Sequence, residues 1–199
     1  MAFRVDRRDI DFFLKEQLDL GKLLSFETFK DFTLDDFDMT ITEGIRLATE
    51  KVAPTNKEAD QIGAQFDKET AAVTAPQCHI DLYKEYCDNG WLGIAANPEF
   101  GGQGFPGAVA IAVGEAMVSA SVTFMMTPGL TRGAGHVIEH FGTDKQKATY
   151  LEKMYSGEWS GTMCLTEPGA GSAVGDLKCS AKDNGDGTYS ISGVKSFIT

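Results

Sequence analysis

Apolar residues recur every three or four positions along much of the first 160 residues, which is the spacing of helices with one buried face. The clearest stretch runs from Leu34 to Ala53, with Pro54 near its predicted end. Further helices are predicted over residues 9–17, 79–89, 108–118, 128–140 and 143–155. We expect the helix over 108–118 to be buried on most sides. Thr143 and Gln146 have the spacing of a capping box at the start of the last helix.

The pattern changes after Gly157. Strands are predicted over residues 162–166, 178–182, 188–192 and 195–199, and the segment 183–187 is a strong turn. A few strands without a completed sheet would leave open edges and an uncovered face. We therefore expect the chain to be a piece of a longer protein.

Composition narrows the class of protein. Hydrophobic residues make up 42% of the 199 residues, so a real core is expected, and the formal net charge of -11 argues against nucleic-acid binding. The chain contains no apolar run of the roughly 18 residues that span a bilayer. The first nine residues lack the apolar stretch of a signal peptide, and the cysteines form no C-x-x-C pair. We therefore expect reduced thiols and a cytoplasmic location.

Two local patterns suggest other chemistry. Residues 102–107 match the G-x-G-x-x-G dinucleotide fingerprint by letter, but Pro106 interrupts the run and no strand–helix–strand unit is predicted around it. Residues 136–140 match the H-x-x-E-H pattern of a class of zinc hydrolases, but no third ligand is evident. We favour a surface loop and helix-surface histidines, and we predict no metal site.

The segment Thr166-Glu167-Pro168-Gly169-Ala170-Gly171-Ser172 carries a stronger signal. Gly169 and Gly171 allow backbone conformations that are closed to other residues. Consecutive N–H groups can then turn inward as an anion-binding nest, to which Ser172 adds a hydroxyl donor. No Gly-Lys-Ser/Thr follows, so the segment is not a Walker loop. The residues alone leave an anion-binding loop and a plain turn both open.

The segment from Met163 to Ser172 resembles the flavin signature of the acyl-CoA dehydrogenase family. Three more blocks resemble family sequences in the same order, at residues 90–104, 141–158 and 193–199. The similarity covers about residues 40–199. Residues 1–35 resemble an N-terminal extension found in a subset of larger members.

The resemblance implies an α+β fold, in which an all-α N-terminal domain precedes an antiparallel β domain and a C-terminal helical domain. This chain would supply the extension (residues 1–35), the helical domain (36–160) and the opening strands of the middle domain (161–199). The implied activity is FAD-dependent α,β-dehydrogenation of an acyl-CoA thioester. The implied partners are an electron-transfer flavoprotein and further copies of the chain, in a homodimer or homotetramer.

The same resemblance assigns site residues. The segment from Met163 to Thr166 would line the flavin, with Leu165 and Thr166 at the pyrimidine edge. In the signature loop, Gly171 and Ser172 would bind the cofactor, and Ser172 would also lie near the CoA. Phe197 would stack on the flavin ring, and Thr199 would hydrogen-bond near flavin N5.

Some features stay outside the resemblance. The catalytic base of the family is a Glu in or just before the C-terminal domain, so we expect it beyond residue 199 and expect these residues alone to be inactive. Ala173 stands where the family usually has Asp, and Met163 where an aromatic residue is frequent. An acyl-CoA oxidase or flavin monooxygenase of the same fold is the alternative. A non-catalytic helical interaction domain is more remote.

Small residues in the helix predicted over 128–140 suggest a substrate pocket. Gly129 and Gly133 fall on one face, although each glycine costs about 1 kcal/mol relative to Ala in a helix interior. By resemblance this region borders the acyl pocket. We expect these glycines to widen that pocket for a long or bulky acyl chain, and close packing against another helix is the alternative.

Overall fold

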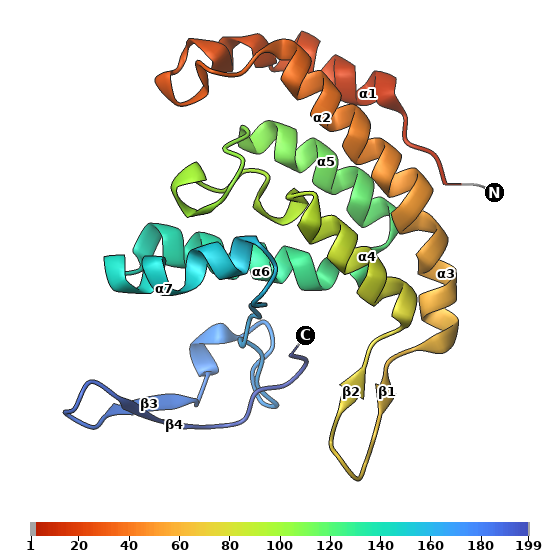
Figure 1. The fold of residues 1–199 in the computed structure, drawn as a ribbon. Helices are drawn as coiled ribbons and strands as arrows, with labels where there is room; N and C mark the ends of the chain where they lie inside the picture. The colour runs from red at the N-terminus through yellow and green to blue at the C-terminus, as the bar shows by residue number, and fades with distance from the viewer. Residues whose placement is uncertain (1–2, 199) are drawn as a thin grey trace.

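The computed structural model describes residues 3–198 as a helical body with two small antiparallel hairpins beneath it (Figure 1). The helices are α1 (Arg7–Asp11), α2 (Leu34–Leu47), α3 (Ala53–Ile62), α4 (Gln77–Asp88), α5 (Gly107–Ala120), α6 (Val122–Phe141) and α7 (Asp144–Tyr155). The strands are β1 (Gln65–Phe66), β2 (Val73–Thr74), β3 (Ser180–Asp183) and β4 (Tyr189–Ser192). Short 3-10 helices cover Leu20–Ser25, Glu27–Phe29, Trp91–Gly93, Pro98–Phe100 and Val174–Asp176, and π-helical turns cover Phe12–Gln17 and Ala48–Val52. The predicted α+β class is confirmed.

The long helix predicted from Leu34 begins where expected and continues further than expected. Thr33 caps α2 through a capping box with Asp36. The predicted end near Pro54 is wrong, because a π-helical turn leads directly into α3 and Pro54 lies in the first turn of that helix. Pro54 has no N–H to donate to the preceding turn, and the helix continues past it through the π-helical turn Ala48–Val52.

The later helices agree with the prediction except at one start. Helix α6 begins at Val122 instead of Pro128, because the side chain of Ser121 accepts the N–H of Phe124 and caps the helix. Pro128 is therefore a buried residue inside the helix. The predicted capping box of Thr143 and Gln146 is present at the start of α7. Among residues 3–198, no helix combines the length and apolar character needed to cross a bilayer.

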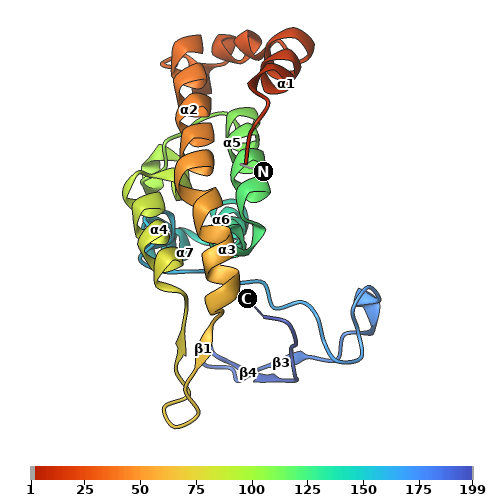
Figure 2. The ribbon, with the colours of Figure 1, turned by 90° about the vertical axis from the view of Figure 1, so that its right-hand side faces the viewer.

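Two of the four predicted strands form. Strands β3 and β4 pair in register from Ser180 with Ser192 to Asp183 with Tyr189, and they lie apart from the helices (Figure 2). Residues 162–166 and 195–198 form no ladder, so the predictions for these segments are wrong over the described residues. Phe197 has φ of 57°, a left-handed value that an extended strand does not contain.

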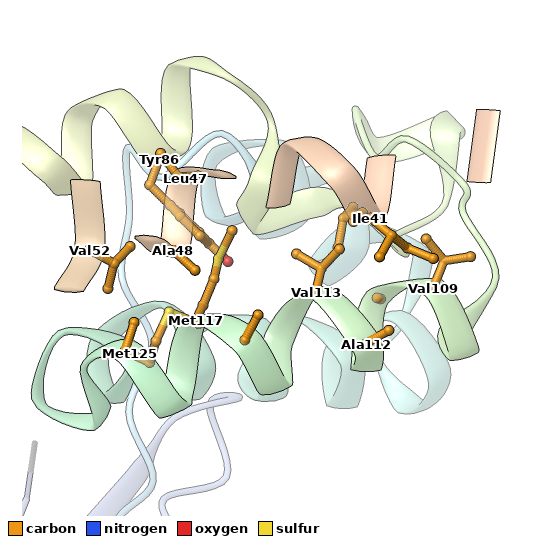
Figure 3. Packing of buried hydrophobic residues seen from close by; sticks show 14 of the residues in the cluster. Ile41, Leu47, Ala48, Val52, Tyr86, Val109, Ala112, Val113, Met117 and Met125 are labelled. Carbon is orange, nitrogen blue, oxygen red and sulfur yellow. The ribbon is translucent and has the colours of Figure 1, made fainter. Parts of the chain in front are cut away.

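The core lies between α2, the following π-helical turn and α5, and α4 and α6 close it from the other side (Figure 3). The close approach of α2 to α5 depends on Gly44, because a Cβ atom there would lie 2.7 Å from Cγ1 of Val113. Helix α5 is less enclosed than predicted: its Ile111 side chain is 72% exposed. One face of α5 is therefore open in the part of the chain that the structure describes.

We predict that Gly44→Ala is less stable than Gly114→Ala by about 1–3 kcal/mol, the usual cost of overpacking a core. Both substitutions improve helix propensity equally, but a Cβ at Gly114 meets only the Arg132 side chain, at 4.0 Å. Urea unfolding of the two variants measures the difference. Equal midpoints and slopes would contradict the proposed tight contact.

Candidate functional site: a buried carboxylate joins the signature segment to the chain end

The signature segment begins its loop with a tight turn. The N–H of Glu167 donates to the carbonyl oxygen of Ala170, and the N–H of Ala170 donates to the carbonyl oxygen of Glu167, both at 3.0 Å. The two residues form an isolated antiparallel bridge, and both are buried. The turn therefore holds Glu167 in place while Pro168 and Gly169 form its exposed tip.

The Glu167 side chain is only 6% exposed, and it collects donors from two later segments. It accepts the backbone N–H groups of Lys178 at 2.8 Å and Cys179 at 3.0 Å, and the Lys195 ammonium at 2.9 Å. Hydrogen bonds from Cys179, the Lys178 N–H and the Lys195 ammonium lower the pKa of Glu167 to about 2. The carboxylate is therefore held in its charged form.

Lys195 extends this contact to the signature backbone. Its Nζ also donates to the carbonyl oxygen of Leu165 at 2.9 Å, and the next residue, Ser196, donates its N–H to the carbonyl oxygen of Thr166 at 2.9 Å. The segments 163–166 and 195–198 therefore lie side by side, although neither is a strand. The structure brings together the two segments that the sequence predicts to contact the flavin.

Gly193 permits the chain to reach this position after β4. Its φ is 142°, and a Cβ atom there would lie 2.1 Å from Sγ of Cys179. The Cys179 thiol donates to the carbonyl oxygen of Val194 at 3.9 Å. The neighbouring Glu167 carboxylate raises the pKa of this thiol. Only glycine fits where the chain crosses Cys179, so the position of Lys195 depends on this close approach.

The two segments carry both exposed apolar side chains and hydrogen-bond donors. Met163, Leu165 and Phe197 are 61%, 42% and 94% exposed. The N–H groups of Leu165 and Thr166 and the Thr166 hydroxyl donate to no group within residues 3–198. These donors beside an exposed aromatic side chain fit a flat, partly apolar ring system with a polar edge. Thr199, predicted to hydrogen-bond near flavin N5, lies outside the described residues.

The loop itself differs from the predicted nest. Neither Gly169 nor Gly171 is among the described glycines with positive φ, and the Ala170 N–H is already bonded within the turn. Of the two interpretations that the sequence leaves open, this conformation therefore fits the plain turn and not the nest. Ser172 is exposed, and its hydroxyl has no partner within residues 3–198.

The glycines predicted to border a substrate pocket do line a cavity. Gly129 and Gly133 face a cavity of about 510 Å³. Its other lining residues are Ala95, Ala96, Arg132, His136, Glu139, His140 and Tyr155. A Cβ atom at Gly129 or Gly133 would meet nothing within 4 Å, whereas one at Gly135 would lie 2.8 Å from the Tyr155 ring. Close packing therefore explains why position 135 is a glycine. It does not explain Gly129 and Gly133, where a side chain would have space.

The two alternative motifs find no supporting geometry. Residues 102–107 follow the 3-10 helix Pro98–Phe100 and are not preceded by a strand. The rings of His136 and His140 lie 4.1 Å apart, and Nδ1 of His140 is 2.9 Å from the carbonyl oxygen of His136. Within residues 3–198, no group of three His, Cys, Asp or Glu side chains could hold a metal ion.

Two residues of this site were not singled out from the sequence. Glu167 lies within the signature loop and Lys195 within the strand predicted over 195–199, and neither position carries a signal of its own. Their pairing spans 28 positions, so no local periodicity reveals it. One signal in the sequence could have identified the pair. An acidic and a basic residue lie in two blocks that, by the resemblance, contact the same cofactor.

Comparisons with known proteins show the family. The family profile described as "Acyl-CoA dehydrogenase, N-terminal domain" matches residues 36–158. Among curated relatives, 3-methylmercaptopropionyl-CoA dehydrogenase of Ruegeria pomeroyi is 37% identical over 100% of this chain and 34% of its own length. A butyryl-CoA dehydrogenase of Syntrophomonas wolfei is 40% identical over 96% of this chain and 32% of its own length.

A solved structure shows the same likeness. The crystal structure of acyl-CoA dehydrogenase complexed with FAD from Bacillus anthracis has a TM-score of 0.65 and 26% identity, over 85% of this chain and 27% of that one. The chain therefore belongs to the acyl-CoA dehydrogenase family, and it spans about a third of the length of the curated relatives it matches.

The low pKa of Glu167 predicts a pH response. Because the pKa in the folded chain is about 2 and the ordinary value is 4.5, the stability contributed by the carboxylate is complete above about pH 4.5 and is lost as the pH falls through about 2. The carboxyl ¹³C shift of Glu167, followed by NMR during acid titration, measures this. A midpoint near 4.5 would show that the carboxylate is not held as described.

Proposed function

We propose that this chain is the N-terminal part of an FAD-dependent acyl-CoA dehydrogenase. It would supply an extension (1–35), the helical domain (36–160) and the start of the middle β domain (161–199). The observation that carries the proposal is the juxtaposition of segments 163–166 and 195–198 through Glu167 and Lys195. The family match supports it independently.

The residues of the two segments would hold FAD in distinct ways. The N–H groups of Leu165 and Thr166, which have no partner within residues 3–198, suit the pyrimidine edge of the flavin ring together with the Thr166 hydroxyl. Met163 and the exposed Phe197 ring offer apolar surface to the ring faces. Gly171 and Ser172 belong to the phosphate side, and the Ser172 hydroxyl also suits the CoA. Thr199 keeps its predicted place near N5.

The reaction removes two hydrogens from the acyl thioester. The carboxylate base expected beyond residue 199 would take the proton from the α-carbon, and bound FAD would supply the acceptor for the hydride of the β-carbon. Within residues 161–198 the protein contributes binding and orientation: it presents donors to one edge of the cofactor and apolar surface to its ring. Glu167 is not the base, because its charge is already neutralised by buried hydrogen bonds.

The remaining parts of the proposal follow from the resemblance. Electrons would leave through an electron-transfer flavoprotein, and the complete protein would be a homodimer or homotetramer in the cytoplasm. An acyl-CoA oxidase is the second candidate, since the same cofactor contacts serve both reactions. The two differ in how fast the reduced flavin reacts with oxygen.

We predict that the purified full-length protein shows flavin absorbance, and that anaerobic addition of butyryl-CoA bleaches it because the acyl group reduces FAD. An artificial electron acceptor should restore the colour much faster than oxygen does. Stopped-flow absorbance measures both steps. Rapid return of colour with oxygen would select the oxidase, and a protein that stays colourless after reconstitution with FAD would refute both candidates.

We also propose that Gly129 and Gly133 open the acyl pocket. They line the cavity of about 510 Å³ together with Ala95 and Ala96, and no atom lies within 4 Å of the position of an added Cβ. Side chains at these positions would project into space that an acyl chain could use. Within residues 3–198 nothing packs against a side chain at either position, which favours the pocket over close packing as the reason for two glycines in α6.

Gly133→Leu in the full-length enzyme is therefore expected to lower kcat/KM for long acyl-CoA substrates by at least about tenfold relative to short ones, because the new side chain fills the pocket. Gly107→Leu is the matched control, since Gly107 also has open space but lies outside this cavity. Chain-length profiles of both variants provide the measurement. A profile of Gly133→Leu that matches the control would disprove the assignment.

A further inference from the structure

The two segments proposed to contact FAD have very little backbone pairing to align them. A single backbone hydrogen bond, from Ser196 N–H to the Thr166 carbonyl, joins them within residues 3–198. The other direct contact comes from a side chain, Nζ of Lys195 on the Leu165 carbonyl. The relative position of the segments therefore depends on where the Lys195 ammonium is held.

The Lys195 ammonium is held by Glu167. The distance from Nζ to Oε1 is 2.9 Å, and the two side chains are 25% and 6% exposed, so this pair is less exposed than the other ion pairs of residues 3–198. Glu167 is itself fixed by the N–H groups of Lys178 and Cys179, immediately before β3. One carboxylate thus joins the signature turn, the start of β3 and the segment after β4.

The placement of the pair differs from that of an ordinary surface ion pair. Lys195 precedes the exposed Phe197 by two positions, and its ammonium contacts the carbonyl of Leu165, whose own N–H is available to a ligand. A shift of Nζ would therefore move the aromatic side chain and the backbone donors relative to each other. Loss of Lys195 would also leave the Glu167 carboxylate buried without its cation, which is unfavourable.

We propose that Glu167 and Lys195 are positioning residues for the flavin: they act as a clamp that sets the spacing between the donor groups of Leu165 and Thr166 and the ring of Phe197. The clamp rests on the proposed function, because it assigns a purpose to a contact between two segments that are proposed to hold FAD. Neither residue touches the reacting atoms. The role of the clamp would be to hold the cofactor-binding surface in one arrangement before FAD binds.

The test uses full-length protein with the variants Glu167→Gln, Lys195→Met and Lys195→Arg. The first two should raise the FAD dissociation constant by at least about tenfold, as expected when residues that orient binding groups are removed. They should also shift the bound flavin absorbance spectrum, because Phe197 and the pyrimidine-edge donors move. Lys195→Arg keeps the charge and a donor, so it should retain most of the affinity.

A control separates positioning from loss of fold. Lys84→Met breaks the exposed pair of Lys84 with Asp88 on α4, far from the clamp along the chain. It should leave FAD affinity and the flavin spectrum unchanged. The far-UV circular dichroism of the cofactor-free variants should match that of wild type, since the helical core between α2 and α5 is untouched. Wild-type FAD affinity and spectrum in both Glu167→Gln and Lys195→Met would overturn the proposal.

A measurement without cofactor keeps the clamp testable even if the proposed function fails. Hydrogen exchange in cofactor-free, full-length protein should show the Ser196 N–H protected in wild type and exchanging faster in Glu167→Gln and Lys195→Met. If wild-type protein binds no FAD, the proposed function is wrong whatever this exchange shows. If FAD binds but the Ser196 N–H exchanges equally fast in all variants, the clamp alone is wrong.

Discussion

The carboxylate of Glu167 must be satisfied inside the protein because it is almost removed from water. An unpaired buried charge is strongly unfavourable, so donors have to converge on it from wherever the chain can supply them. Here they come from residues 11, 12 and 28 positions further along. That requirement orders a region whose own hydrogen-bond ladder is limited to β3 and β4. Residues 161–198 thus gain a defined shape without a completed sheet.

The helices support residues 161–198. Gly44 lets α2 approach α5, and α6 crosses beneath them with its cap at Ser121. Thr131 of α6 is fully buried and its hydroxyl accepts the N–H of Gly161 at 3.1 Å, directly before the signature segment. The positions of segments 163–166 and 195–198 are therefore set from two sides: by α6 through Gly161, and by Glu167 through Lys195.

The sequence predicts the helical body well because its apolar periodicity is long and regular. The errors fall where a tertiary or local contact decides. Pro54 does not end the helix, because a π-helical turn leads into α3, and Ser121 starts α6 before Pro128. The hairpin of β1 and β2 was missed because its strands are two residues long and exposed, which leaves no apolar alternation to detect.

The site could be predicted in its location and only partly in its construction. Motif order placed residues 163–172 and 193–199 at one cofactor, and the structure brings the described parts of these segments together. The strands predicted there need neighbouring strands to pair with. Within residues 3–198 the two segments are joined by one backbone hydrogen bond and by one hydrogen bond from a lysine side chain. The glycine nest fails for a related reason, since the Ala170 N–H is used inside the turn that holds Glu167.

The central claim is that segments 163–166 and 195–198 together form one face of a flavin site. Hydrogen exchange of the full-length protein, compared with and without FAD, tests it most directly. The account predicts that FAD slows exchange in both segments together, including the N–H groups of Leu165 and Thr166. Unchanged exchange in both segments, while FAD is demonstrably bound, would contradict it.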